Sequence, residues 1–318
     1  VSSQDEIHGA YGGVVPELAS RQHIRNILPI IDAALGKAGV TLKDLGGIAV
    51  THGPGLVGSL LVGLSVAKGM AFRWGMPYVG VNHLEAHLLA IHLEHEVPFP
   101  YIALLASGGH TLLYCVKDVG EYLYLGGTRD DAAGEAYDKV AKMMGLGYPG
   151  GPALSKLADE FFRSGQSNPF KLPRPMLRSG DLNFSFSGLK TAVLTLARKQ
   201  PLTQQTQGAI ASAFQEAVVD VLTEKSLAAL LKTGLTQLVV AGGVGANRQL
   251  RSNLCRETEK MGATVFFPEL EFCTDNGAMI AFAGAMRLQA SEAWNRKLDN
   301  TFTIKARWDL EMQEAAGG

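Results

Sequence analysis

The sequence predicts an α/β protein of mixed layers, because short apolar strands alternate with longer segments of helical spacing. The clearest strands are expected at 47–51, 78–81, 101–106 and 238–241. Glycine is a further observation, since 37 of the 318 residues are glycine, above an average usage of about 7%. This glycine content favours tight turns and close approaches of the backbone, as nucleotide-binding α/β proteins need.

The first third of the chain is expected to hold two helices around a strand. One helix should begin near Pro16, which suits a first helical turn, and end at Gly39 with a kink at Pro29. Its apolar residues recur at helical spacing: Ile24, Ile27, Leu28, Ile31 and Leu35. The strand at 47–51 then leads through a turn to a glycine-studded helix at 56–74.

The rest of the chain continues this alternation. Strands at 112–116 and 122–125 are expected as antiparallel neighbours of 101–106, with a last strand at 264–267. Proline and basic residues between 170 and 188 predict an irregular loop. Helices are expected at 131–144, 152–162, 204–232, from Ser187 or Gly188, and from near Asp275.

Composition restricts the class of protein. Apolar residues make up 47% of the chain, enough for a sizeable core, and a net charge of −1 does not favour unaided binding of nucleic acid. Three cysteines without CxxC spacing indicate reduced thiols and a cytoplasmic protein. No apolar run reaches the roughly 20 residues of a membrane span. The first residue is Val1 rather than methionine, as in a fragment or processed form.

Two histidines suggest a metal site. His83 and His87 lie four residues apart, which on a helix places both imidazoles on one face. A site needs a third ligand, for which Asp275 is the best candidate. The alternatives are a packed helix face for the pair and a helix N-cap for Asp275. Two histidines and one carboxylate would leave coordination positions open for a substrate.

Two glycine turns and one acidic pair are candidates for nucleotide contacts. Ser107–Thr111 and Gly242–Asn247 each follow an apolar strand, where glycine lets backbone N–H groups turn toward a phosphate. A β-hairpin turn is the alternative for the first. Glu135 and Asp138, three residues apart on a helix, could bind ribose hydroxyls or could form an exposed acidic face. No arrangement of a catalytic serine or cysteine stands out, so no nucleophile is assigned.

Taken together, these stretches resemble the tRNA threonylcarbamoyladenosine transferase family, called TsaD in bacteria. The resemblance covers essentially the whole chain. The matching motifs are Tyr11–Arg21, Gly53–Gly58, His83–His87, Ser107–Thr111, Asp130–Glu135, Tyr148–Pro152, Phe184–Lys190 and Phe272–Ala278. The family's opening strand and turn, of the form xxGIETSCDET, is absent, so the first strands of lobe I and part of the nucleotide cleft are expected to be missing.

The resemblance implies a two-lobed actin-like ATPase fold, of the sugar kinase and heat-shock-70 type. Residues 1–99 would form lobe I, completed by a C-terminal helix at 275–318, and 100–274 would form lobe II. The implied ligands of Fe²⁺ or Zn²⁺ are His83, His87 and Asp275. The implied contacts to ATP, AMP or threonylcarbamoyl-AMP are Leu105, Ala106, Ser107, Gly108, Gly109, Asp138, Gly151 and Asn247, with Glu135 in support.

The activity implied is transfer of a threonylcarbamoyl group from its adenylate to N6 of the adenosine 3′ to the anticodon, in tRNAs that read codons beginning with A. The implied partners are tRNA, a TsaB-like paralogue and a TsaE-like ATPase, with no membrane. We expect the basic loop Lys171–Arg178 to contact tRNA, with a solvated loop as the alternative.

Three other classes compete with this interpretation. The spacing HxxxH invites a metallopeptidase, but Leu84 stands where the zinc-peptidase signature HExxH has its general base. An actin-like small-molecule kinase or ATPase would need an acidic base near the γ-phosphate and no histidine pair. A non-catalytic TsaB-like paralogue would lack the histidine pair.

Overall fold

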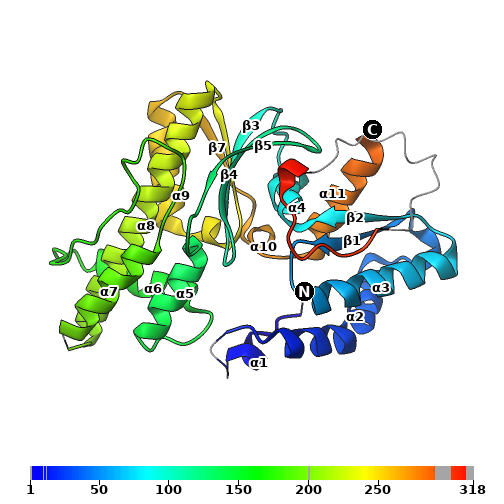
Figure 1. The fold of residues 1–318 in the computed structure, drawn as a ribbon, viewed down its shortest axis with the longest axis horizontal. Helices are drawn as coiled ribbons and strands as arrows, with labels where there is room; N and C mark the ends of the chain where they lie inside the picture. The colour runs from blue at the N-terminus through cyan, green and yellow to red at the C-terminus, as the bar shows by residue number, and fades with distance from the viewer. Residues whose placement is uncertain (1, 10, 12, 200, 291–301, 313–318) are drawn as a thin grey trace. The chain divides into compact units, whose positions relative to one another are not determined.

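The computed structural model describes residues 2–9, 11, 13–199, 201–290 and 302–312, which form two compact units (Figure 1). Unit 1 contains the described residues of 1–95, 118–122 and 275–318. Unit 2 contains those of 96–117 and 123–274. Each unit has its own sheet, as expected for an α/β protein.

Unit 1 is built on a two-stranded parallel sheet of β1 (Ile48–Gly53) and β2 (Tyr78–Asn82). Successive side chains of a strand point to opposite faces. Val50 faces α3, since it lies against Gly63, and Ala49 faces α11, since it lies against Gly284. The helices of this unit are α1 (Asp5–Gly9), α2 (Pro16–Ala38), α3 (Val57–Trp74), α4 (His83–Leu89) and α11 (Gly277–Ala290), with short 3₁₀ turns at Leu42–Asp44 (η1) and Ala90–Leu93 (η2).

The helix boundaries of unit 1 follow local chemistry. α2 begins at Pro16, as expected, because proline lacks the N–H group that a first turn cannot use. It ends at Gly39, whose φ of 66° is the left-handed conformation that glycine adopts without steric cost. Pro29 lies inside this helix, which continues on both sides of it.

Unit 2 is built on a five-stranded sheet in the order β5-β4-β3-β6-β7. β3 (Tyr101–Ala106) pairs antiparallel with β4 (Thr111–Asp118) and parallel with β6 (Gln237–Ala241), which pairs parallel with β7 (Thr264–Phe266). β5 (Glu121–Gly127) is the other edge, and the hairpin tip at 118–122 belongs to unit 1. All six residues of β3 are buried, as its continuous apolar sequence predicts.

The helices of unit 2 surround one long central helix, α8 (Gln204–Thr233). Its buried residues include 208–211, 213–215 and 217–219, so most of its middle is buried, although Glu216 is exposed. The other helices are α5 (Ala133–Met143), α6 (Gly150–Arg163), α7 (Ser187–Lys199), α9 (Arg248–Lys260) and α10 (Leu270–Cys273), with a 3₁₀ turn at Gly243–Ala246 (η3). Figure 1 shows α5 to α9 on one side of this sheet, to its left in the view.

One expectation about the C-terminal part of the chain is wrong. A helix was expected to extend over 275–318, and α11 covers Gly277–Ala290 of this range. The segment 302–309 is not helical, and only a single 3₁₀ turn, Leu310–Met312, follows. Lys305 donates its N–H to the His52 carbonyl at 2.7 Å, so this segment lies along the end of β1. The expected helix over 291–301 and 313–318 lies outside the described residues.

Membrane-spanning segments were also sought. Among the helices that the structure describes, none is both long and apolar enough to cross a bilayer.

Candidate functional site

The two histidines are placed by a well-capped helix start. The Asn82 side chain accepts hydrogen bonds from the N–H groups of Leu84 at 2.8 Å and Glu85 at 3.4 Å. Such a cap satisfies N–H groups that a first helical turn leaves unpaired, so α4 begins at His83. His83 and His87 then lie one turn apart with ring centroids 4.8 Å from each other.

Asp275 joins these histidines from the other end of the sequence. Its Oδ1 atom lies 3.4 Å from His83 Nε2 and 3.0 Å from His87 Nε2. One ligand atom from each of the three residues lies within 4.8 Å of the others. The N-cap of α11 is a different residue, because the Asn276 side chain accepts from the N–H of Met279 at 2.9 Å. The helix-cap alternative for Asp275 is therefore wrong.

The electrostatics of this cluster favour a charged carboxylate. Partial desolvation alone would raise the pKa of Asp275, but hydrogen bonds from the two histidines and their charges lower this pKa overall. The His87 side chain is only 3% exposed, whereas that of Asp275 is 76% exposed. Two imidazole nitrogens and one carboxylate oxygen are a donor set that suits Fe²⁺ or Zn²⁺, so the residues fit such an ion.

The segment Ser107–His110 is a tight turn of a β-hairpin. Ala106 of β3 pairs with Thr111 of β4, and the Ser107 hydroxyl accepts from the N–H of His110 at 3.1 Å. The hairpin alternative is therefore correct in geometry. In the described part of the chain no hydrogen bond uses the N–H of Gly108 or Gly109, and both residues are exposed. These N–H groups are thus available to a ligand.

The start of α5 lies directly against this turn. The N–H of Gly134 donates to the Ser107 carbonyl at 3.2 Å, and the N–H of Ala133 donates to the Thr111 hydroxyl at 2.8 Å. A Cβ atom on Gly134 would lie 2.6 Å from the Ser107 carbonyl oxygen. Glycine at this position therefore permits the close approach of helix and turn.

The second glycine turn lies at the same sheet edge. β3 and β6 are parallel neighbours, and the carboxyl ends of parallel strands meet at one edge. Gly242, with a φ of 90°, packs against the carbonyl of Ala106. The structure thus brings together the two segments, Leu105–Gly109 and Gly242–Asn247, that the sequence predicts as nucleotide contacts.

The two acidic residues of α5 have separate partners. Asp138 Oδ1 accepts from the N–H groups of Gly150 at 2.8 Å and Gly151 at 3.3 Å, and so caps the first turn of α6. Glu135 lies 2.8 Å from Lys139 Nζ and accepts from the N–H of Ala132 at 3.4 Å. Asp138 keeps its second oxygen for a further donor, whereas Glu135 supports its own helix.

Asn247 is held by a buried residue that sequence reasoning missed. Its Nδ2 donates to Gln215 Oε1 at 2.7 Å and to Ser155 Oγ at 3.2 Å, while its Oδ1 accepts from the N–H of Leu250 at 3.0 Å. Gln215 is 1% exposed and also donates to Gln249 Oε1 at 3.0 Å. A buried glutamine on a long apolar helix is the only sequence signal that could have indicated it.

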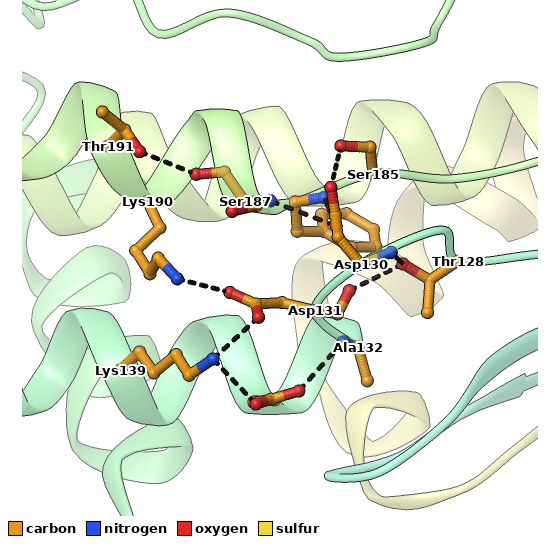
Figure 2. A network of polar contacts seen from close by, with 11 residues as sticks. Thr128, Asp130, Asp131, Ala132, Lys139, Ser185, Ser187, Lys190 and Thr191 are labelled. Atoms are coloured by element: carbon orange, nitrogen blue, oxygen red, sulfur yellow. Dashed lines mark hydrogen bonds and ion pairs between the residues drawn. The ribbon is translucent and has the colours of Figure 1, made fainter.

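A second missed feature is a polar network at the start of α5 (Figure 2). Asp131 forms ion pairs with Lys139 at 2.7 Å and Lys190 at 2.8 Å. Asp130 caps α7 by accepting from the N–H groups of Phe186 at 2.8 Å and Ser187 at 3.2 Å. The network therefore joins the starts of α5 and α7. Both aspartates lie in motifs of the resemblance, but their partners Lys190, Phe186 and Ser187 are far away in the sequence.

The solved structures most similar in fold include HypF from T. kodakarensis, with a TM-score of 0.60, 15% identity, and coverage of 83% of this chain and 43% of that chain. A full-length HypF bound to phosphate and nucleotide has a TM-score of 0.53, 14% identity, and coverage of 72% and 38%. Such low identities show the fold alone. Together with the sheets and glycine turns described above, they define this chain as an actin-like α/β protein, which confirms the expected class.

Sequence comparison is more specific. A family profile described as TsaD, tRNA N6-adenosine threonylcarbamoyltransferase, matches residues 1–282. The transferase of this name from Nitrosospira multiformis is 68% identical over 98% of this chain and 90% of its own length. That from Methylobacillus flagellatus is 58% identical over 97% and 89%. The chain belongs to the tRNA N6-adenosine threonylcarbamoyltransferase family, and the expected transferase class is confirmed.

Proposed function

We propose that this protein transfers the threonylcarbamoyl group of threonylcarbamoyl-AMP to N6 of the adenosine 3′ to the anticodon, in tRNAs that read codons beginning with A. The observation that carries the proposal is the 68% identity to a named transferase over nearly the whole chain. The three-residue cluster in unit 1 and the nucleotide-type turns in unit 2 support it from geometry.

His83, His87 and Asp275 are proposed to hold one Fe²⁺ or Zn²⁺ ion. The cluster offers three protein ligands, which leaves open positions for oxygen atoms of a substrate. An ion bound there would supply Lewis acidity and a fixed positive charge. The residues themselves supply a carboxylate ligand, because the neighbouring His83 and His87 lower the pKa of Asp275 against the effect of burial.

The turn at Leu105–Gly109 is proposed to bind the phosphate of the adenylate. The exposed N–H groups of Gly108 and Gly109 could donate to phosphate oxygens. The N-terminus of α5 lies against this turn, and a helix N-terminus favours a negative charge. These donors are fixed before the ligand arrives, which is the arrangement that best stabilises developing charge.

Asp138, Gly151 and Asn247 are proposed to hold the adenosine part. Asp138 Oδ2 would accept from ribose hydroxyls, since Oδ1 is engaged at the start of α6. Both amide hydrogens of Asn247 are engaged by Ser155 and Gln215. Its Oδ1 retains one lone pair, so Asn247 would act only as an acceptor, toward a hydroxyl or an amino group.

The structure limits which part of the basic loop would contact tRNA. Arg174 lies 2.7 Å from Asp220 and 3.7 Å from Glu216, so its charge is already balanced. Lys171 and Arg178 are exposed on the same loop. We infer that these two residues, and not Arg174, contact the tRNA backbone. The cytoplasmic location and the TsaB-like and TsaE-like partners are also proposed, from the family resemblance.

The surroundings of Glu85 argue against the metallopeptidase alternative. This carboxylate is fully buried and bound to Tyr122 and Arg287. It is therefore unavailable as a general base for a water molecule. The kinase alternative gains no support from any contact described above.

The proposal is tested by elemental analysis and a transfer assay on His83→Ala, with tRNA and threonylcarbamoyl-AMP as substrates. We expect this variant to lose bound metal and transfer activity together. His23→Ala is the matched control, because His23 lies on α2 and its ring contacts Gln4, away from the cluster. A His83→Ala protein that keeps both its metal and its activity contradicts the proposed metal centre.

A further inference from the structure

Glu85 is a buried carboxylate on the helix that carries the two histidines. Its side chain has no exposed surface, yet it lies 2.7 Å from Arg287 Nε and accepts a hydrogen bond from the Tyr122 hydroxyl at 2.8 Å. The contact with Arg287 is an ion pair without the alignment of a hydrogen bond. Glu85 therefore has two partners from distant parts of the sequence, both within unit 1.

Helix geometry excludes Glu85 as a fourth member of the cluster. Residues two positions apart on an α-helix point in directions that differ by about 200°. Glu85 lies two positions after His83 and two before His87, so its side chain leaves α4 on the side opposite the imidazoles. Its contacts with Arg287 and Tyr122 agree with this direction.

The ion pair connects the two elements that supply the cluster. α4 carries His83 and His87, and Asp275 lies just before α11, which carries Arg287 (Figure 1). The spacing of the three cluster residues thus depends on how α4 packs on α11. A buried pair of opposite charges favours the packing that keeps the two charges together, and in some proteins buried polar pairs provide geometric specificity of this kind.

Tyr122 completes the arrangement from the hairpin tip. Burial and the neighbouring Glu85 carboxylate raise the pKa of the Tyr122 hydroxyl well above its ordinary value. The hydroxyl therefore stays protonated and remains a donor, and it also accepts from the N–H of Gly120 at 3.2 Å. One oxygen of Glu85 thus accepts a hydrogen bond from Tyr122, and the other is paired with the charge of Arg287.

We propose that Glu85, Arg287 and Tyr122 form a positioning cluster that fixes α4 against α11 and so sets the spacing of His83, His87 and Asp275 for one divalent cation. The inference rests on the proposed metal centre. Removal of residues that orient metal ligands without binding the metal typically lowers metal affinity by 10- to 100-fold.

The test is a Co²⁺ titration of the full chain after removal of bound metal, followed by visible absorption. Arg287→Met leaves Glu85 buried without its cation, and we expect at least a tenfold loss of Co²⁺ affinity with a changed absorption spectrum. Arg287→Lys restores the charge and is expected to recover most of the affinity. Tyr122→Phe is the milder change, and we expect it to reduce Co²⁺ affinity by about threefold. This variant keeps the test decisive if Arg287→Met does not fold.

Leu64→Ala is the matched control. Leu64 is 4% exposed and belongs to the core on the α3 side of the sheet. This variant loosens unit 1 without touching the α4–α11 contact, so we expect its Co²⁺ affinity to stay within twofold of the wild type.

The outcomes separate the two levels of the proposal. A wild-type chain that binds no Co²⁺ refutes the metal centre itself. Wild-type affinity in both Arg287→Met and Tyr122→Phe, or an equal loss in Leu64→Ala, refutes the positioning role and leaves the metal centre standing.

Discussion

Replacement of Gly134 by alanine tests the close contact between α5 and the turn that follows β3. The new Cβ atom would lie 2.6 Å from the Ser107 carbonyl oxygen, and ordinary contact begins at 3.4 Å. Helix and turn must therefore separate by about 0.8 Å, the difference between these two distances. Alanine gains about 1 kcal/mol over glycine in a helix, whereas overpacking costs about 1–3 kcal/mol. We expect a net loss of unfolding free energy of about 0–2 kcal/mol.

The effect on ligand binding should be larger than the effect on stability. Displacement of catalytic geometry by about 1 Å can reduce activity 100-fold, so we expect at least a tenfold loss of affinity for AMP, measured by calorimetry. Gly188→Ala is the matched control, because Gly188 is also the second residue of a helix and its nearest contact to an added Cβ is 3.8 Å, from Pro175. Unchanged AMP affinity in Gly134→Ala would refute the inferred contact between turn and phosphate.

Three further predictions concern the networks of unit 2. Hydrogen bonds to two lysines lower the pKa of Asp131 against the opposing effect of burial, so its ion pairs stabilise the fold at neutral pH and are lost as the pH falls through this lowered pKa. Asp131→Asn should lower the free energy of unfolding by about 1–2 kcal/mol at pH 7, measured by urea unfolding. This difference from wild type should shrink at pH 3. A difference that grows on acidification would contradict the stabilising role of the Asp131 ion pairs. Gln215→Leu leaves one amide hydrogen of Asn247 without its acceptor, which should lower the free energy of unfolding by about 1–3 kcal/mol. The same change should raise KM for the adenylate. An unchanged KM would argue against the role of Asn247 in binding adenosine. Lys171→Ala and Arg178→Ala should each reduce the salt slope of tRNA binding by about one, and a slope equal to wild type for both would exclude this loop.

The sequence predicted those parts of the fold that depend on local pattern. The buried strand at 101–106 was expected with its correct ends, because its apolar residues are continuous and glycines follow it. The start of α2 at Pro16 and its end before Gly39 follow from the chemistry of these two residues. The expected helix over 275–318 is wrong at 302–309, where the chain instead lies along the end of β1 through a contact that is distant in the sequence.

The candidate site shows the same division between local and distant information. His83 and His87 could be paired from spacing alone, and Asp275 entered as the best third candidate. Sequence reasoning could not find Arg287 as the partner of Glu85, or Lys190 as a partner of Asp131, because these pairs are separated by many residues and arise from tertiary packing. Sequence reasoning also could not assign the N-cap of α11 to Asn276, because the adjacent Asp275 is an equally suitable residue type for an N-cap.

Two imidazoles and one carboxylate are proposed to bind a single metal ion. X-ray absorption at the metal edge of the purified chain tests this most directly. We expect an inner shell of two imidazole nitrogens and further oxygen ligands at about 2.0–2.2 Å. A shell that contains sulfur, or one without imidazole, would contradict it.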